Sequence, residues 1–499
     1  MEFARRAPPN LPLVLLTIAY GNPQLSDRSV LISADHGLAT IYFLQSDFVS
    51  SLIDAGVHVV LLTADGLVRE VEQRYGNKGM TVRGLRLDQA REFEAKNAEM
   101  QWWLAYLRRA GSSNRINTAA LDSYVDQTAV EQPNHRRTLM PAARAMVRLM
   151  RNSKHARQAV ENAQARFTSS IYADMFQQYR PRLIIAATPG WRLDRYLLRE
   201  AAAAGIPTVA MTVGWDNPSS YGLAGAPKGA INCWSEIQRT ELVDGSDWPV
   251  TSVNIGGIPA YDGYFRRQWL LPRDQYYFQH GLDPARKLLA YACSFVSFSP
   301  SMQNLRPLVE LVGNGKLNSS TQLLIRLHPN HFLDNPLFAR ELREIRALAE
   351  AHDHVHVVEP IPLGGEFGHY SGEDMPEKAS MMAHADVFLT VYSTMVVEAA
   401  IHDRPIVSVC IDAEKGWDRP RKYSLRLSEI GNWPTHARFR EARAGEVVDT
   451  AEGLAAAINR ALDDPAESAE ARRKFIEREV TYTDGQAARR TAEFVLSLV

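Results

Sequence analysis

The stretch from Asp386 to Cys410 narrows the possible folds more than any other part of this sequence. It reads DVFLTVYSTMVVEAAIHDRPIVSVC. The run from Val387 to Val391 is apolar throughout, which is typical of a parallel strand covered on both faces. Tyr392 to Thr394 then predict a sharp turn and a helix start, and the pair Arg404–Pro405 ends that helix before a second apolar strand. This order of elements predicts one unit of a doubly wound α/β sheet.

The turn in this stretch also has the composition of a phosphate site. Ser393 and Thr394 place two hydroxyls at a helix start, where free backbone N–H groups and the positive dipole end attract anions. Glu398 follows one turn later on the same face, and its unused carboxylate suits ribose hydroxyls. The alternative is simple capping, but a capping box has its acid three residues after the cap, where Val397 stands. We therefore interpret the turn as half of a nucleotide site.

The alternation of strands and helices runs through both halves of the chain. We expect strands at 29–33, 58–63, 182–187, 208–213, 229–234 and 253–257 in the first half, and at 288–293, 322–327, 354–358 and 387–391 in the second. This pattern predicts an α/β fold of two doubly wound, Rossmann-like domains, and 499 residues suffice for both cores. We expect the first domain at 1–265, the second at 266–480 and a C-terminal helix at 481–499, with a linker from about Tyr264 to Ala285.

A helical insertion from about residue 92 to residue 180 interrupts the first domain. Between residues 136 and 166 it holds eight Arg or Lys and one acid, Glu161. A lipid surface with anionic headgroups or a phosphorylated acceptor fits this pattern, but a solvated helix face is the plainer and favoured interpretation. Its arginines share a helix face opposite its apolar side chains: Arg144, Arg148 and Arg151 against Met146, Leu149 and Met150.

Composition limits the classes of function and the compartment. The 56 basic and 57 acidic side chains give a net charge of −1, so no whole-chain field favours nucleic acid or a membrane. Three distant cysteines in apolar runs predict reduced, buried thiols and a cytoplasmic protein. The apolar run from Leu11 to Ala19 is too short to span a bilayer, and we interpret it as a strand or a packed arm.

Two further pairs of residues follow predicted strands and are candidates for the site. Asp35 and His36 come after the first strand, at the sheet edge where doubly wound folds bind ligands; they are candidate catalytic bases, or else a helix cap and a solvated loop residue. Arg326 and His328 end another strand, lie two residues apart and offer hydrogen-bond donors to a phosphate. Because His328 and the Ser393 turn are expected on one carboxyl edge, we expect them in one pocket.

Several motifs together resemble the GT-B glycosyltransferases, in the branch of CDP-glycerol glycerophosphotransferases, bacterial sialyltransferases and capsule Kdo transferases. They are RLHP at Arg326 to Pro329, DVFLTVYSTMVVEA at Asp386 to Ala399 and TDGQAARR at Thr483 to Arg490. The resemblance implies two domains facing across a cleft, with the C-terminal helix packing back toward the first domain. It covers nearly the whole chain except the insertion.

Carried over by position, the resemblance implies roles for individual residues. His328, Ser393 and Thr394 would hold the donor phosphate together with Arg326, and Glu398 would hold the ribose. Asp35 or His36 would be the general base. His436, in a segment from Lys415 to Arg443 with eight basic residues and three acids, would also reach the donor, as a lid or else as part of a solvated loop.

The leading hypothesis is an inverting, metal-independent glycosyltransferase. It would use a nucleotide-activated sugar as donor substrate and no cofactor. Its acceptor would be an envelope or capsule glycan or a lipid-linked acceptor, and the protein would be cytoplasmic, with possible peripheral membrane contact through the basic helix near Arg144 to Arg151. The alternatives are a CDP-glycerol-type glycerophosphotransferase, a UDP-sugar 2-epimerase and a non-catalytic nucleotide-sugar-binding protein.

Overall fold

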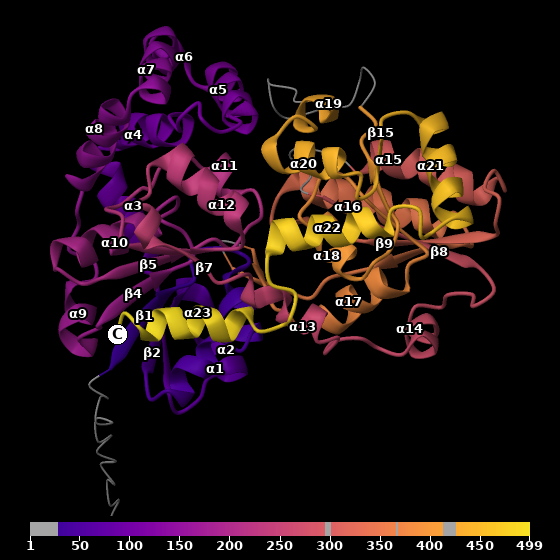
Figure 1. Ribbon diagram of the computed structural model, residues 1–499, viewed down its shortest axis with the longest axis horizontal. Coiled ribbons are helices and arrows are strands. Elements are labelled where there is room, and N and C mark those ends of the chain that lie inside the picture. The colour runs from indigo at the N-terminus through magenta and orange to yellow at the C-terminus, as the bar shows by residue number, and fades with distance from the viewer. Residues whose placement is uncertain (1–27, 295–300, 366–367, 413–425) are drawn as a thin grey trace, which may run out of the picture.

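Two parallel β-sheets, one from each half of the chain, form the framework of the protein (Figure 1). The computed structural model describes residues 28–294, 301–365, 368–412 and 426–499. The run from Leu11 to Ala19 and the first part of the basic segment, Lys415 to Leu425, lie outside these residues. The predicted α/β class is confirmed, because helices connect the parallel strands throughout.

The first sheet has seven parallel strands with the order β3-β2-β1-β4-β5-β6-β7. Its central strands are mostly apolar and buried because helices cover both faces of the sheet. The order reverses between β1 and β4, so this sheet has its topological switch point there. The strands are β1 (Ser29–Ser33), β2 (His58–Thr63), β3 (Met80–Gly84), β4 (Leu183–Ala186), β5 (Thr208–Met211), β6 (Ala230–Cys233) and β7 (Val253–Ile255).

The second sheet has six parallel strands with the order β10-β9-β8-β13-β14-β15. Its switch point lies between β8 and β13, which pair with Leu289 opposite Val387 and Ala292 opposite Thr390. The stretch around Ser393 therefore leaves the sheet at the position where such folds bind ligands. The strands are β8 (Lys287–Ala292), β9 (Thr321–Arg326), β10 (Val355–Val358), β13 (Val387–Thr390), β14 (Ile406–Val409) and β15 (Glu446–Val448).

Helices surround both sheets, and the predicted insertion is entirely helical. The helices beside the first sheet include α1 (Phe48–Asp54), α2 (Val68–Tyr75), α10 (Asp194–Ala203), α11 (Asn217–Ser220) and α12 (Glu236–Thr240). The insertion comprises α3 (Leu87–Ala95), α4 (Ala98–Ala110), α5 (Ala119–Glu131), α6 (Asn134–Arg137), α7 (Met140–Asn152), α8 (Lys154–Ala165) and α9 (Ala173–Tyr179). The second domain includes α15 (Met302–Gly313), α16 (Pro336–Glu350), α17 (Met375–His384), α18 (Met395–Ile401), α19 (Leu427–Ile430), α20 (Pro434–Ala442) and α21 (Ala451–Asp463).

The segment between the two sheets is packed rather than an exposed tether. It forms α13 (Asp262–Phe265) and α14 (Arg273–Gln279), where we expected a linker without regular structure. Tyr264 and Tyr276 are buried, and the Tyr276 hydroxyl donates to Glu377 of α17 over 3.0 Å. The aromatic residues of this segment therefore pack against the second domain.

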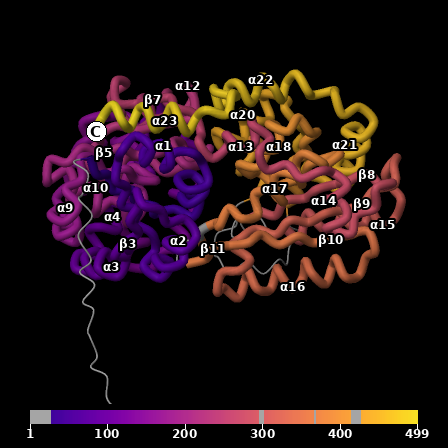
Figure 2. The backbone as a smooth tube through the Cα atoms, turned by 90° about the horizontal axis from the view of Figure 1, so that it is seen from below, coloured from indigo at the N-terminus to yellow at the C-terminus, as the bar shows by residue number. Residues whose placement is uncertain are grey.

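The C-terminal segment returns from the second domain to the first (Figure 2). It forms α22 (Ala469–Val480) and α23 (Ala487–Leu496), and α23 runs beside α1. The Asp262 carboxylate accepts hydrogen bonds from the backbone N–H groups of Ala487 and Ala488, at 2.9 and 2.8 Å, so a buried acid fixes the start of this helix. This contact connects α23 to the segment between the sheets.

The state of the three cysteines agrees with the prediction from the sequence. Cys233, Cys293 and Cys410 are all free and buried, which confirms the predicted reduced thiols. Among the described helices, none is long and apolar enough to cross a membrane.

Candidate active site

Two neighbouring cavities open at the carboxyl edge of the second sheet. The first has a volume of about 170 Å³ and lies between the domains, with Leu38 and Tyr42 on one side and Lys378 and Glu398 on the other. The doubly wound domains thus face each other across a cavity, which confirms the predicted GT-B arrangement.

The second cavity, of about 220 Å³, is lined by aromatic side chains that include Trp215, Trp433 and His436. Trp215 and Asp216 belong to the loop after β5, and their place in this cavity makes that loop a lip of the cleft. Three residues line both cavities: His328, Ser393 and Thr394. The strand ends predicted to meet at one edge therefore lie at the junction of the two cavities.

The Ser393–Thr394 turn differs in detail from a simple helix cap. The Ser393 hydroxyl accepts a hydrogen bond from the Met395 N–H group over 3.2 Å, while the Thr394 side chain makes no capping hydrogen bond to the helix. The helix that follows, α18, has only seven residues, so its dipole is weaker than that of a long helix. Attraction for a phosphate at this turn therefore depends mainly on nearby hydroxyl, imidazole and ammonium groups.

His328 is neutral at physiological pH. Burial, and then the charges of His331, Arg326 and Lys378, lower its pKa to about 3. Its Nδ1 accepts a hydrogen bond from the Asn330 N–H group over 3.1 Å, so the single proton of the neutral ring lies on Nε2. The Nε2 atom lies 3.3 Å from the Tyr370 hydroxyl, so His328 offers a phosphate one neutral N–H that Tyr370 also contacts.

Arg326 lines the first cavity but is engaged by acids of its own domain. Its guanidinium forms ion pairs with Asp374 and Glu377, and the residue is buried. A buried charge needs such partners, so Arg326 organises the cavity wall and its direct contact with a donor stays a prediction.

Glu398 is not the unused carboxylate that we expected. Lys378 Nζ of α17 lies 2.6 Å from Glu398 Oε2, and the Tyr264 hydroxyl donates to the same carboxylate over 2.6 Å. All three side chains line the first cavity. Lys378 and Tyr264 were missed from the sequence because each comes from another element, with no local motif to mark it.

Asp35 and His36 line neither cavity. Asp35 is fully buried, and its Oδ2 accepts a hydrogen bond from the Asp194 N–H group over 2.6 Å, at the start of α10. Burial, and then the charge of Asp194, raise the pKa of Asp35 to about 8. His36 Nδ1 accepts from the Leu38 N–H group over 3.1 Å. Their proposed role as general base therefore stays a prediction.

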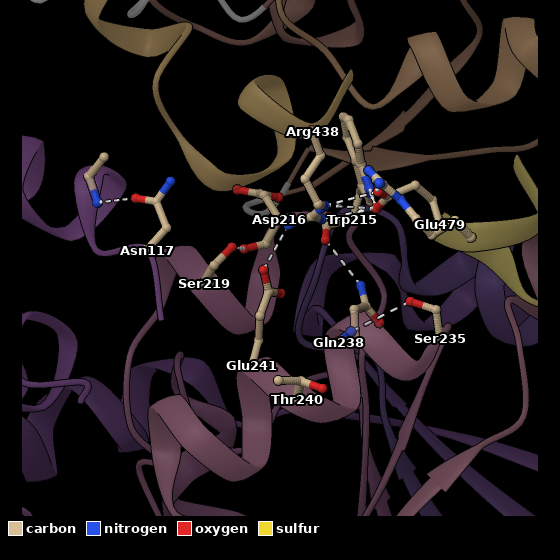
Figure 3. A network of polar contacts seen from close by, with 12 residues as sticks. Asn117, Trp215, Asp216, Ser219, Ser235, Gln238, Thr240, Glu241, Arg438 and Glu479 are labelled. Carbon is tan, nitrogen blue, oxygen red and sulfur yellow. Dashed lines mark hydrogen bonds and ion pairs between the residues drawn. The ribbon is translucent and has the colours of Figure 1, made fainter. Parts of the chain in front are cut away.

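A network of polar contacts fixes the second cavity at the boundary between the domains (Figure 3). Arg438 of α20 bonds to Glu241, which begins the π-helix η3 (Glu241–Gly245) of the first domain, and to Glu479 of α22. The Trp215 indole donates to Glu479 over 2.8 Å, and Gln238 donates to the Trp215 carbonyl over 3.0 Å. The loop that carries Trp215 and Asp216 is thus held by both domains.

His436 is part of the aromatic wall of the second cavity. Its ring lies 5.9 Å from that of Trp215 and 4.6 Å from that of Tyr392, between centroids. Burial, and then the charge of Arg438, lower its pKa to about 3, so His436 contributes a neutral ring. A flat ligand or an apolar sugar face fits such a wall.

One protein-family model matches most of the second domain and the C-terminal helix. Residues 317–497 match the family model described as CDP-Glycerol:Poly(glycerophosphate) glycerophosphotransferase. The predicted resemblance is confirmed. The match also confirms the prediction of a transferase. No curated protein is similar enough in sequence to match the chain.

Solved structures with a similar fold share little sequence with the chain. A UDP-GlcNAc 2-epimerase from Neisseria meningitidis, bound to UDP-GlcNAc, is 12% identical with a TM-score of 0.49, covering 94% of this chain and 100% of that one. A glycosyltransferase from Rickettsia africae ESF-5 is 9% identical with a TM-score of 0.49, covering 94% and 98%. The wall teichoic acid polymerase TagF is 12% identical with a TM-score of 0.42, covering 65% and 75%. Similarity at this level carries no functional argument.

The glycerophosphotransferase match includes only part of the candidate site. His328, Lys378, Ser393, Glu398 and His436 all lie inside the matched residues. Trp215, Asp216, Asp35 and His36 lie outside them, in the first domain. The family match thus contains one wall of each cavity, and the opposite walls belong to this chain's own first domain.

Proposed function

We propose that this protein is a transferase that moves a sugar from a nucleotide-activated donor to a hydroxyl of an envelope or capsule glycan or of a lipid-linked acceptor. The observation that carries the proposal is that His328, Ser393 and Thr394 line both cavities. A donor phosphate at this junction has its nucleoside in the first cavity and its transferred group in the second. In this proposal the reaction takes place at the cytoplasmic face of the membrane.

The first cavity suits the nucleoside part of the donor. The Glu398 carboxylate accepts hydrogen bonds from the ribose hydroxyls, and the apolar side chains near Leu38 and Tyr42 cover the base. The Lys378 ammonium, held 2.6 Å from Glu398, adds a positive charge beside the phosphates. The donor therefore meets a carboxylate, an ammonium and an imidazole N–H in one enclosed space.

The second cavity suits the acceptor and contains a candidate base. Asp216 lines it together with His328 and the Ser393 turn, and burial raises the pKa of Asp216. A raised pKa favours proton uptake from an acceptor hydroxyl. In the reaction, the acceptor oxygen forms its bond to the anomeric carbon, the bond from that carbon to the phosphate oxygen breaks, and Asp216 takes the proton. The leaving phosphate keeps the electron pair and is stabilised by His328 and Lys378.

The family match favours a second candidate, transfer of glycerol phosphate from CDP-glycerol. In that reaction the acceptor oxygen forms a bond to the phosphorus of the glycerophosphate, the phosphoanhydride bond breaks, CMP leaves with the electron pair, and Asp216 takes the acceptor proton. Product analysis separates the two candidates, because only glycerophosphate transfer places phosphorus from the donor on the acceptor.

The decisive test has a binding part and a turnover part. Calorimetry with CMP, CDP, UDP and GDP identifies the nucleotide, and mass spectrometry of envelope extracts incubated with the matching donors identifies the transferred group. We expect one nucleotide to bind and its sugar donor to be consumed. Unchanged nucleotide binding in the His328→Ala variant would refute the proposed site, and an acceptor that gains a glycerophosphate from the donor would establish the second candidate instead.

A further inference from the structure

The apolar side chains of helix α7 in the insertion, with Leu139 just before it, divide into a buried set and an exposed set. Val147 and Met150 are buried, at 4% and 0% exposure, against the rest of the insertion. Leu139, just before the helix, and Met146 and Leu149 within it point outward with 54%, 43% and 54% exposure. Met146 and Met150 lie one turn apart on the same side of the helix, as predicted, but Met146 is exposed whereas Met150 is buried.

The charged residues around this outer face are predominantly basic. Arg144 and Arg151 are held by Asp126 and Asp122, at 2.8 and 2.5 Å, so these two arginines are partly neutralised. Arg137 and Arg148 are exposed and have no ion-pair partner among the residues that the structure describes. Arg137 lies two residues before Leu139, and Arg148 and Leu149 are successive residues of α7 that project about 100° apart and are both exposed. The outer face therefore combines exposed apolar side chains with uncompensated positive charge.

We propose that this surface, formed by Leu139, Met146 and Leu149 with Arg137 and Arg148 and named here the α7 patch, docks on an anionic lipid bilayer. Apolar side chains enter the headgroup region while the arginines meet lipid phosphates. Three partly exposed side chains cannot supply the roughly 800 Å² per partner that a stable protein interface buries. A bilayer needs no such area, because apolar insertion and charge attraction act together.

The insertion that carries the α7 patch also borders the cavity proposed for the acceptor. In Figure 1, α6 and α7 form the outermost tip of the insertion, above the first sheet. The insertion also borders the second cavity: Asn117 donates to the Asn432 carbonyl over 3.2 Å, and the Trp433 indole donates to the Ser123 hydroxyl over 3.0 Å. The insertion therefore joins the docking surface to the rim of the acceptor cavity. This last step rests on the proposed function, whereas docking itself does not.

The test is co-sedimentation of the full chain with vesicles of phosphatidylcholine and phosphatidylglycerol, compared with pure phosphatidylcholine vesicles. We expect binding to the anionic vesicles that weakens between about 0.05 M and about 0.5 M salt, because screening shortens the range of the attraction. The double variant Arg137→Gln/Arg148→Gln should bind about thirtyfold more weakly, since each basic residue near an anionic surface contributes a factor of about five. A matched control, Lys316→Gln/Arg473→Gln, removes two exposed cations of the second domain and should bind like the wild type.

Apolar insertion is tested separately. The variant Leu139→Ser/Met146→Ser/Leu149→Ser should bind at least about tenfold more weakly, and Phe278→Ser, which removes an 88% exposed side chain from α14, should have no effect. Equal sedimentation of the wild type and both patch variants would overturn the proposal. So would a concentration-dependent dimer that the triple variant abolishes, because the patch would then join two copies of the chain. Vesicle binding is measured without a donor and nucleotide binding without vesicles, so the two proposals fail separately.

Discussion

Arg438 Nη1 of the second domain lies 2.8 Å from Glu241 Oε1 of the first domain, and both side chains are largely buried. The same guanidinium bonds to Glu479, whose side chain is 1% exposed. Two buried carboxylates thus share one cation at the lip of the second cavity (Figure 3). Burial raises the pKa of Glu241 to about 7 even though Arg438 acts to lower it. Because this ion pair joins the two domains beside the second cavity, a change in the orientation of the domains would change the shape of that cavity.

Replacing Arg438 by Met should destabilise the protein by about 3–5 kcal/mol, because the change leaves buried carboxylates without their cation. Urea unfolding followed by circular dichroism measures the loss. The control is Arg478→Met, since Arg478 is 46% exposed and lies 3.4 Å from the same Glu479, so its removal should cost less than about 1 kcal/mol. Equal losses in the two variants would show that Arg438 has no special role at the boundary.

Removing the hydroxyls at the junction of the cavities should weaken nucleotide binding. We expect Ser393→Ala/Thr394→Val to raise the Kd for the cognate nucleotide about tenfold or more, because hydrogen bonds to a charged group contribute about 1.5–3 kcal/mol each. Calorimetry gives the Kd. Ser320→Ala, an exposed serine of the same domain, is the control and should leave it unchanged. An unaltered Kd in the double variant would place the phosphate elsewhere.

Glu398 gives a prediction about the ribose itself. Glu398→Gln keeps the shape of the side chain but weakens it as a hydrogen-bond acceptor, so affinity for the ribonucleotide should fall about tenfold. Affinity for the 2′,3′-dideoxy nucleotide, which lacks the ribose hydroxyls, should be weak in the wild type and little changed in the variant. A parallel loss for both nucleotides in calorimetry would instead indicate that Glu398 acts only through Lys378 and Tyr264.

The sequence predicted the central strands of both sheets and two of the four edge strands, β7 and β10. The central strands β1 and β13 are buried and mostly apolar, whereas the edge strands β3 and β15 contain polar, partly exposed residues and were not predicted. Because ligands bind at the carboxyl edge of such sheets, we expected His328 and Ser393 in one pocket, and both line the same two cavities. Tyr264, 134 residues from Glu398, has no local signal because only the packing between the domains brings it there.

The buried pair Asp35 and Asp194 should make stability depend on pH. Burial raises the pKa of Asp35 from 3.8 to about 8 and that of Asp194 to about 6, so the folded state holds protons that the unfolded state has lost. Stability is therefore greatest near and below the unfolded pKa of these groups and falls as pH rises through this window toward about 8. Urea midpoints for the wild type should decrease over that range, less steeply in Asp35→Asn. An equal slope in both proteins would assign the dependence to other groups.

The structure offers a different candidate for the general base from those that the sequence suggested. Asp216 lines the second cavity beside His328, whereas Asp35 is buried against Asp194 and lines neither cavity. We expect Asp216→Asn to lower kcat at least about 100-fold with little change in nucleotide Kd, because general base catalysis contributes about 10²–10⁴-fold. His36→Ala is the matched comparison and should keep most of the activity. The pH profile of the remaining Asp216→Asn activity should lose its ascending limb, since that limb reports ionisation of the base. Full activity in Asp216→Asn together with loss in His36→Ala would return the base to the loop after β1.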